Sequence, residues 1–515
     1  MTGERPRSSP GSFPEARTKL KAHAIGLPGA TMQAIACIAP AIAALFFTQF
    51  VVSLAGVTAP LAYALGVCIA LMLGSTLVQL SKHMSSAGGY YTFASRAIGP
   101  RFGFMTAWMY VFYTPLAAGP SYAYFGYVLQ QELRSHYSIN APYLWWLTLI
   151  VCAPAVAFLA WRGLALSVKV LVGLGLAEMA IVLSLALSGF ASPGPGGFNL
   201  SSWVPSHSLS GEGFALAVVF SLQAITGWEA AAPLAEETAN PRRNIPRATM
   251  IAIIGLGVFL VIMFWGQIIG WGTSILTGLQ NPRSMTRSPE LPGLAIAQRV
   301  WGGAWVIVLG AMFSSMLAVC QGCNNVSTRI WYKMGETGAL PGWFGHVHPT
   351  RSTPTHAILA NLMLSLVVGL TVGYLVNPAR SFLLIDGLVL VLSVMFIYVS
   401  ANITVFFYYL KKRRREFNVM LHIVLPAASS AALIFVTIRS YQPFPKFPYN
   451  YAPLIVGAWF VVGVGVLAYL WMTKRDDWIT KVGQSSVEAD YVAPAEELAT
   501  VHVLSTGGQS IHGKN

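Results

Sequence analysis

Residues 31–54 read TMQAIACIAPAIAALFFTQFVVSL, a run without a single Asp, Glu, Lys or Arg. A helix needs about 20 apolar residues to cross the hydrocarbon of a lipid bilayer, so this run is long enough to span one. Pro40 lies near its middle, where it removes one backbone donor and clashes with the preceding helical turn. We therefore expect a membrane-spanning helix that is interrupted near Ala39-Pro40-Ala41.

Similar apolar runs follow along the whole chain, and together they predict about twelve membrane spans. The predicted spans are 31–54, 58–80, 102–131, 142–161, 164–190, 213–235, 248–272, 301–329, 355–376, 381–409, 419–438 and 451–473. The runs are continuous and do not alternate at period two, which favours helices over a membrane barrel. The composition agrees, because 55% of the residues are hydrophobic and only 10% are charged, against about 25% charged in soluble domains. The predicted fold class is an all-α membrane protein.

A net charge of +14 could indicate nucleic-acid binding, but the positions of the charges fit a membrane protein better. With the N-terminus inside and twelve crossings, most of the 32 Lys and Arg residues fall on the inner side, as the positive-inside rule requires. The basic run 411–415 fits a topology anchor better than a site for anionic lipid heads. We expect a multi-pass protein of the cell (plasma or inner) membrane with both termini cytoplasmic, embedded in the lipid bilayer and without a nucleic-acid partner.

A second interruption is predicted in span 213–235, at Thr226-Gly227-Trp228-Glu229. Gly tolerates non-helical backbone angles, so the helix can break there. Two breaks at corresponding places, five spans apart, indicate an inverted-repeat transporter with its site at the midplane. Gln223 and Thr226, just before this break, are candidates to face a solute. A simple helix kink remains the alternative at each position.

Three acidic residues lie within predicted spans, where each charge costs roughly 2.5–3.5 kcal/mol. Glu229 directly follows the second break, and we favour a gating or proton-coupling role for it over a helix cap. Glu178, deep in span 164–190, is a candidate proton carrier or a neutral group bonded to a carbonyl. Asp386 is expected near the outer start of span 381–409, where water could reach it.

Span 301–329 carries polar side chains, of which Ser314 and Ser315 could form part of a cavity wall or only join helices. Cys320 and Cys323 have C-x-x-C spacing but no second pair or His cluster, so they are predicted to be small buried side chains. No metal, no cofactor and no catalytic residue is predicted, and the absence of a phosphate-binding loop argues against an ATP-driven pump or another enzyme.

Longer motifs carry a family resemblance. The stretch 227–248, GWEAAAPLAEETANPRRNIPRA, resembles the sixth span and following loop of the amino acid–polyamine–organocation (APC) permeases. The motifs SAGGYY at 86–91 with GPRFGF at 99–104, and GALP at 338–341 with VHP at 347–349, resemble the family's stretches before span 3 and after span 8. The matches agree in order and spacing over spans 1 to 10.

The resemblance implies a LeuT-like fold of two five-span inverted repeats with helices 1 and 6 broken, plus two extra C-terminal helices. The implied division is an inner tail (1–28), a first repeat (29–190), a second repeat (191–410), two further spans (411–475) and a disordered inner tail (476–515). The implied substrate-binding residues are Ala39, Pro40, Ala41, Ile42, Ala43, Ala44, Gln223, Ala224, Thr226, Gly227 and Trp228. Glu229 matches a gating glutamate, and Glu178 falls where some relatives carry a lysine in place of a sodium ion.

One departure concerns the first break, where many relatives have Gly-Ser-Gly and this chain has IAPAIAA at 38–44. The extra methyl groups narrow the approach of a carboxylate, and Pro40 withdraws a donor, so an amine without a carboxylate is an open alternative.

The sequence thus predicts a permease that moves an amino acid or related amine by alternating access, with H⁺ as the favoured coupling ion. The alternatives are an uncoupled exchanger, a polyamine or amine transporter, and a transporter-like solute sensor.

Overall fold

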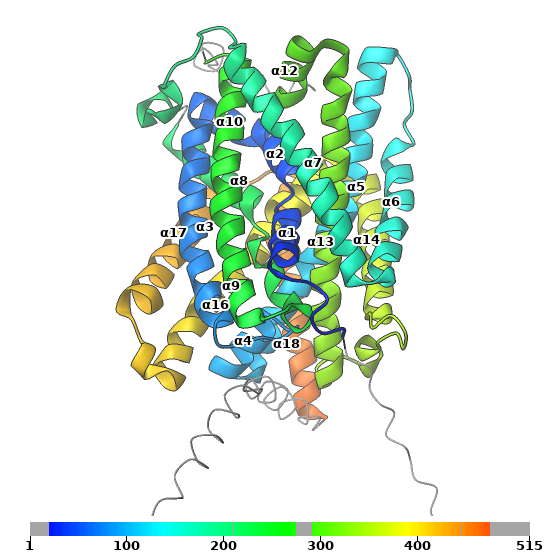
Figure 1. Ribbon diagram of the computed structural model, residues 1–515, viewed down its shortest axis with the longest axis vertical. Coiled ribbons are helices and arrows are strands. Elements are labelled where there is room, and N and C mark those ends of the chain that lie inside the picture. Colours follow the sequence, from blue (N-terminus) through cyan, green and yellow to red (C-terminus); the bar gives the residue numbers. More distant parts are fainter. Residues whose placement is uncertain (1–19, 209, 274–290, 443, 474–515) are drawn as a thin grey trace, which may run out of the picture.

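The computed structural model describes residues 20–208, 210–273, 291–442 and 444–473, and these residues contain helices but no β-strand. Figure 1 shows the helices standing side by side along the long axis of the molecule, with α1 in the middle of the bundle. The predicted C-terminal tail, 476–515, and residues 1–19 of the predicted N-terminal tail lie outside the described residues.

The α-helices succeed one another along the chain with short connections. They are α1 (Leu27–Ile38), α2 (Pro40–Ala55), α3 (Ala59–Ser81), α4 (Tyr90–Ala97), α5 (Pro100–Tyr137), α6 (Leu144–Arg162), α7 (Leu164–Ala191), α8 (Gly211–Ile225), α9 (Pro241–Ile251), α10 (Gly257–Trp271), α12 (Pro292–Trp301), α13 (Val306–Thr337), α14 (Thr355–Val376), α15 (Pro378–Phe382), α16 (Leu390–Lys412), α17 (Leu425–Ser440) and α18 (Ala452–Met472). Short 3-10 or π segments join or extend them: η1 (Gly56–Thr58), η2 (Ser201–Trp203), η3 (Pro205–His207), η4 (Trp228–Glu237), η5 (Ala252–Leu256), η7 (Gly302–Trp305), η8 (Gly342–Gly345), η9 (Leu383–Val389), η10 (Arg414–Glu416), η11 (Met420–Val424) and η12 (Tyr449–Tyr451).

Ten helical stretches of the described residues are long and apolar enough to cross a membrane. The first of them, Leu27–Ser81, contains the first two predicted spans. The third predicted span falls on α5, which has 38 residues and is not one of the ten stretches. Each later predicted span falls on one of the other stretches. The predicted all-α membrane fold is confirmed, whereas the division into two repeats at residue 190 stays a prediction.

Burial separates the centre of the bundle from its edge. The most apolar window of Leu27–Ser81 is 89% buried, whereas that of Tyr449–Met472 is only 11% buried. Large apolar side chains such as Val461 and Trp471 on α18 are exposed, as expected where lipid is the solvent. The interrupted first span therefore lies inside protein, where irregular backbone can be tolerated.

Glycines let the helices around this centre approach closely. A Cβ atom on Gly119 of α5 would lie 2.3 Å from the carbonyl oxygen of Ser365 on α14. A Cβ atom on Gly189 of α7 would lie 2.1 Å from the carbonyl oxygen of Gly266 on α10. Such contacts between small residues favour helix association in lipid, where the hydrophobic effect gives little attraction between helices.

Candidate functional site

Both predicted helix breaks are present. The first span divides into α1 and α2 at Ala39, whose φ of 57° and ψ of 78° lie in the left-handed region. The other broken span divides into α8 and η4, with Thr226 extended and Gly227 at a φ of 129°. A left-handed conformation is costly for alanine and easy for glycine, so surrounding packing must hold Ala39 in place.

The two breaks touch each other. A Cβ atom on Gly227 would lie 2.7 Å from the carbonyl carbon of Cys37, in the last turn of α1. Only a residue without a side chain fits there, because the opposing atoms are backbone. The sequence therefore brings the loose ends of two distant helices together in the middle of the bundle.

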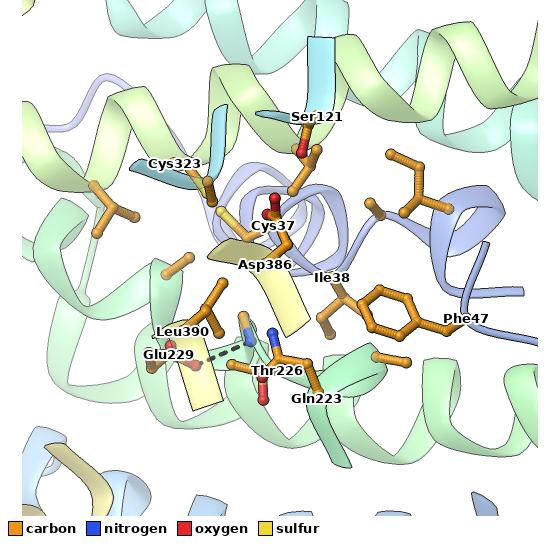
Figure 2. A pocket seen from close by; sticks show the side chains of 18 of the residues that line it. Cys37, Ile38, Phe47, Ser121, Gln223, Thr226, Glu229, Cys323, Asp386 and Leu390 are labelled. Carbon is orange, nitrogen blue, oxygen red and sulfur yellow. Dashed lines mark hydrogen bonds between the residues drawn. The ribbon is translucent and has the colours of Figure 1, made fainter. Parts of the chain in front are cut away.

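A small cavity with a volume of about 70 Å³ lies at this contact. Figure 2 shows side chains from several helices pointing into it. Its lining residues are Cys37, Ile38, Ala39, Ile42, Phe47, Tyr110, Ala117, Ser121, Gln223, Ala224, Thr226, Gly227, Glu229, Ala230, Val319, Cys323, Val326, Phe382, Asp386 and Leu390.

The predicted site residues, which comprise the substrate-binding, gating and cavity-wall candidates, divide into two groups at this cavity. Those that line it are Ala39, Ile42, Gln223, Ala224, Thr226, Gly227 and Glu229. Those outside its lining are Pro40, Ala41, Ala43, Ala44, Trp228, Glu178, Ser314 and Ser315. Trp228 instead stacks on Tyr398 of α16 with ring centroids 5.0 Å apart, and Ser314 donates to the carbonyl oxygen of Leu174 at 3.4 Å.

Glu229 joins the second break to α16. Its Oε2 accepts a hydrogen bond from the backbone N–H of Gly227 at 3.2 Å and another from the hydroxyl of Tyr398 at 2.9 Å. The side chain is buried, with 1% of the residue exposed. A buried carboxylate needs such donors because water no longer solvates it. Glu229 therefore links the second helix break to α16 through these two hydrogen bonds.

Asp386 is a second buried carboxyl group at the cavity, and the expectation that water reaches it near the end of a span is wrong. It lies on the π segment η9, is 7% exposed and lines the cavity. Ser121 of α5 lines the cavity with it, and the Oδ2 of Asp386 has no partner among the described residues. A π turn shifts the side chains that follow it and often occurs at functional sites.

The backbone donors at the start of α2 are largely removed or occupied. Pro40 has no N–H, and the N–H of Ile42 donates to the hydroxyl oxygen of Ser315 at 3.2 Å. A helix N-terminus usually offers free N–H groups to an anion. Among residues 40–42, the structure gives no hydrogen-bond partner for the backbone N–H of Ala41. Ser315 therefore caps the first break from outside the cavity.

Glu178 lies on α7 and is fully buried, as its position in the span predicts. Neither carboxyl oxygen has a partner in good hydrogen-bond geometry among the described residues, although the Ser315 hydroxyl faces the group. Glu178 thus sits behind the first break, with Ser315 between it and the N-terminus of α2.

Other lining residues were not singled out from the sequence. Ser121, Tyr110 and Phe382 carry no motif, and only packing shows that they meet. Asp386 did give a signal, because an acidic side chain within a membrane span is rare and marks a functional site by default.

Comparison with known proteins gives a consistent class. The family model for amino acid permeases matches residues 29–481. An uncharacterized transporter of Rhizobium meliloti is 29% identical over 322 residues, which is 60% of this chain and 64% of the relative. The low-affinity putrescine importer PlaP of Escherichia coli is 27% identical over 312 residues, 58% of this chain and 64% of the relative. The serine/threonine exchanger SteT of Bacillus subtilis is 25% identical over 384 residues, 73% of this chain and 81% of the relative. The matched region spans less than two thirds of the length of the first two relatives.

Proposed function

Because the chain belongs to the amino acid permease family, we propose that it is a secondary active transporter for a small amine-bearing solute, an amino acid or a related amine. The observation that supports this most is the buried cavity at the contact of two broken helices, with two carboxyl groups in its wall. The family consists of membrane transporters, and the named relatives carry an amine or hydroxyl amino acids.

The charges around the cavity favour the amine end of a solute. Glu229 and Asp386 line it, and none of the described lining residues is Lys, Arg or His. The Oδ2 of Asp386 has no partner among the described residues, and a buried carboxyl oxygen without one is costly, so an ammonium group that enters the cavity would relieve that cost. A carboxylate would find few donors at the start of α2, where Pro40 has none and Ile42 is already bonded. An amine without a carboxylate is therefore expected to bind at least as well as an amino acid.

The hydrogen bonds of Glu229 support the proposal of alternating access. The carboxyl group bonds the backbone of its own helix break and the hydroxyl of Tyr398 on α16. Movement of the broken helices against α16 would stretch the bond to Tyr398 and expose Glu229 to an incoming cation or proton. Glu178, buried behind the first break, is the second proposed proton carrier. Coupling to H⁺ is thus part of the proposal.

A binding screen followed by uptake tests the proposal. Purified protein is heated with a panel of amino acids and amines, since a ligand that binds only the folded state raises the melting temperature. Solutes that stabilise are then tested for uptake into proteoliposomes with and without a pH gradient. We expect stabilisation by an amine and uptake that a gradient accelerates. Binding without uptake would mean a sensor, and counterflow independent of the gradient would mean an uncoupled exchanger.

A further inference from the structure

Two thiol groups from different helices meet in the wall of the cavity. Cys37 lies in the last turn of α1 and Cys323 lies on α13, and both line the cavity. Gly322, the residue next to Cys323, packs against the side chain of Cys37, and Figure 2 shows both cysteines beside the cavity. Both are free thiols in the structure.

The helix backbones hold this pair together. A Cβ atom on Gly322 would lie 2.5 Å from the sulfur of Cys37 and 3.4 Å from its Cα. The side chain of Gln33 donates to the carbonyl oxygen of Gly322 at 3.0 Å and so ties α1 to α13 one turn away. Because both contacts involve backbone atoms of α13, the closeness of the two thiols does not depend on a flexible side chain alone.

The C-x-x-C spacing on α13 points to a different pair, which the structure does not favour. Cys320 does not line the cavity, and its sulfur faces the carbonyl oxygen of Ala118 on α5 at 3.7 Å. Cys323 lines the cavity together with Cys37, and its neighbour Gly322 packs against the Cys37 side chain. Cys320 is therefore a matched control, one turn along the same helix and equally buried.

We propose that Cys37 and Cys323 form an oxidation site whose disulfide joins α1 to α13 and stops transport. A two-electron oxidant of the peroxide class takes two electrons and two protons from the thiols. One S–S bond then forms, and hydrogen peroxide leaves as two waters. This inference rests on the proposed function in one respect, because transport stops only if α1 must move against α13.

Solute and oxidant would reach the pair by the same route. Both thiols line the cavity that holds the solute, so they meet water when the cavity opens. Glu229, the proposed partner of the amine, lines the same cavity as the two thiols. A bound amine should therefore cover the thiols and slow their oxidation.

The experiment uses the full-length protein in proteoliposomes treated with hydrogen peroxide. Peptide mapping is expected to find a peptide that links residues 37 and 323, and dithiothreitol should release it. Where a solute is taken up, uptake should fall at least tenfold on oxidation and return on reduction. Cys37→Ser and Cys323→Ser should both keep their uptake after peroxide, and Cys320→Ser should lose it as the wild type does.

The two readouts separate the inference from the proposed function, because the peptide map needs no transport. Absence of the linked peptide in the wild type would overturn the pair, even if uptake is normal. A linked peptide with unchanged uptake would overturn the claim that α1 moves against α13. If Cys37→Ser does not fold, Cys323→Ser decides, and its inhibition by peroxide would also count against the proposal.

Discussion

The two helix breaks meet in one cavity but differ in what they present to it. The break between α1 and α2 has methyl groups, a proline without a donor, and an N–H that Ser315 already occupies. The break between α8 and η4 has a glycine packed against the Cys37 backbone and places Glu229 in contact with Tyr398. One end of the cavity is thus apolar with few donors, while the other is acidic.

This difference indicates how a shared architecture changes its preference. In an inverted-repeat transporter the loose N–H groups of a broken helix usually hold the anionic end of a solute. Here those groups are mostly withdrawn at the first break, and Asp386 adds a second carboxyl group to the cavity. Under the proposed function, the positive end of the solute would therefore supply most of the recognition.

The largest effect is expected from Gly227→Ala, which disrupts the contact between the two helix breaks. In Gly227→Ala the new Cβ would lie 2.7 Å from the Cys37 backbone, and the φ of 129° disfavours alanine. We expect a loss of at least about 3 kcal/mol of stability, because backbone strain and overpacking add. The melting temperature of purified protein measures it. Gly310→Ala on α13, with no atom within 4 Å of its Cβ position, is the control and should melt as the wild type does. Equal melting of both variants would contradict the contact.

Glu229→Gln should fold normally and lose most of its transport. The amide keeps the size of the side chain but removes the charge that Gly227 and Tyr398 satisfy. Hydrogen bonds to charged groups contribute about 1.5–3 kcal/mol, so uptake should fall by about 10- to 100-fold. Initial uptake rates per reconstituted protein measure the effect. Glu212→Gln, exposed at the start of α8, is the control. Uptake by Glu229→Gln at the wild-type rate would show that the Glu229 charge is not needed for transport.

Asp386→Asn should weaken the binding of amines more than the binding of amino acids. The change removes one of the two carboxyl groups at the cavity and keeps the shape of the side chain. We expect about a tenfold loss of affinity for an amine without a carboxylate, close to 1.4 kcal/mol. Competition of each solute against a labelled one measures this. An equal loss for both classes, or none, would show that Asp386 does not select charge.

Ser315→Ala should have the smallest effect and the opposite direction. It frees the N–H of Ile42, so the first break gains a donor for a carboxylate. We expect the affinity for amino acids to rise about threefold relative to amines, since a single exposed donor contributes about 0.5–1.5 kcal/mol. Ser314→Ala, whose hydroxyl donates to Leu174 instead, should leave the ratio unchanged. If the ratio of amino acid affinity to amine affinity is the same in both variants, Ser315 does not influence solute recognition.

The sequence predicted the breaks because their causes are local. Pro40 restricts the backbone and lacks a donor, while Gly227 permits angles that other residues avoid, whatever the helices beside them. The depth of Asp386 was not predictable in this way, because η9 and the packing of α5 decide where its side chain points. The pairing of Cys37 with Cys323 joins residues far apart in the chain, whereas spacing drew attention to Cys320. The role of Ser315 as a cap, and not as a cavity wall, likewise depends on a contact between α13 and α2.

The central claim is that a positively charged solute binds between the two breaks. Its most direct test is a structure of the protein with the amine that raises its melting temperature most. We predict density for the amine in the cavity, with its nitrogen within hydrogen-bond distance of the Glu229 or Asp386 carboxyl group. An amine bound elsewhere, or a carboxylate held at Ala41 with both carboxyl groups left unoccupied, would contradict the account.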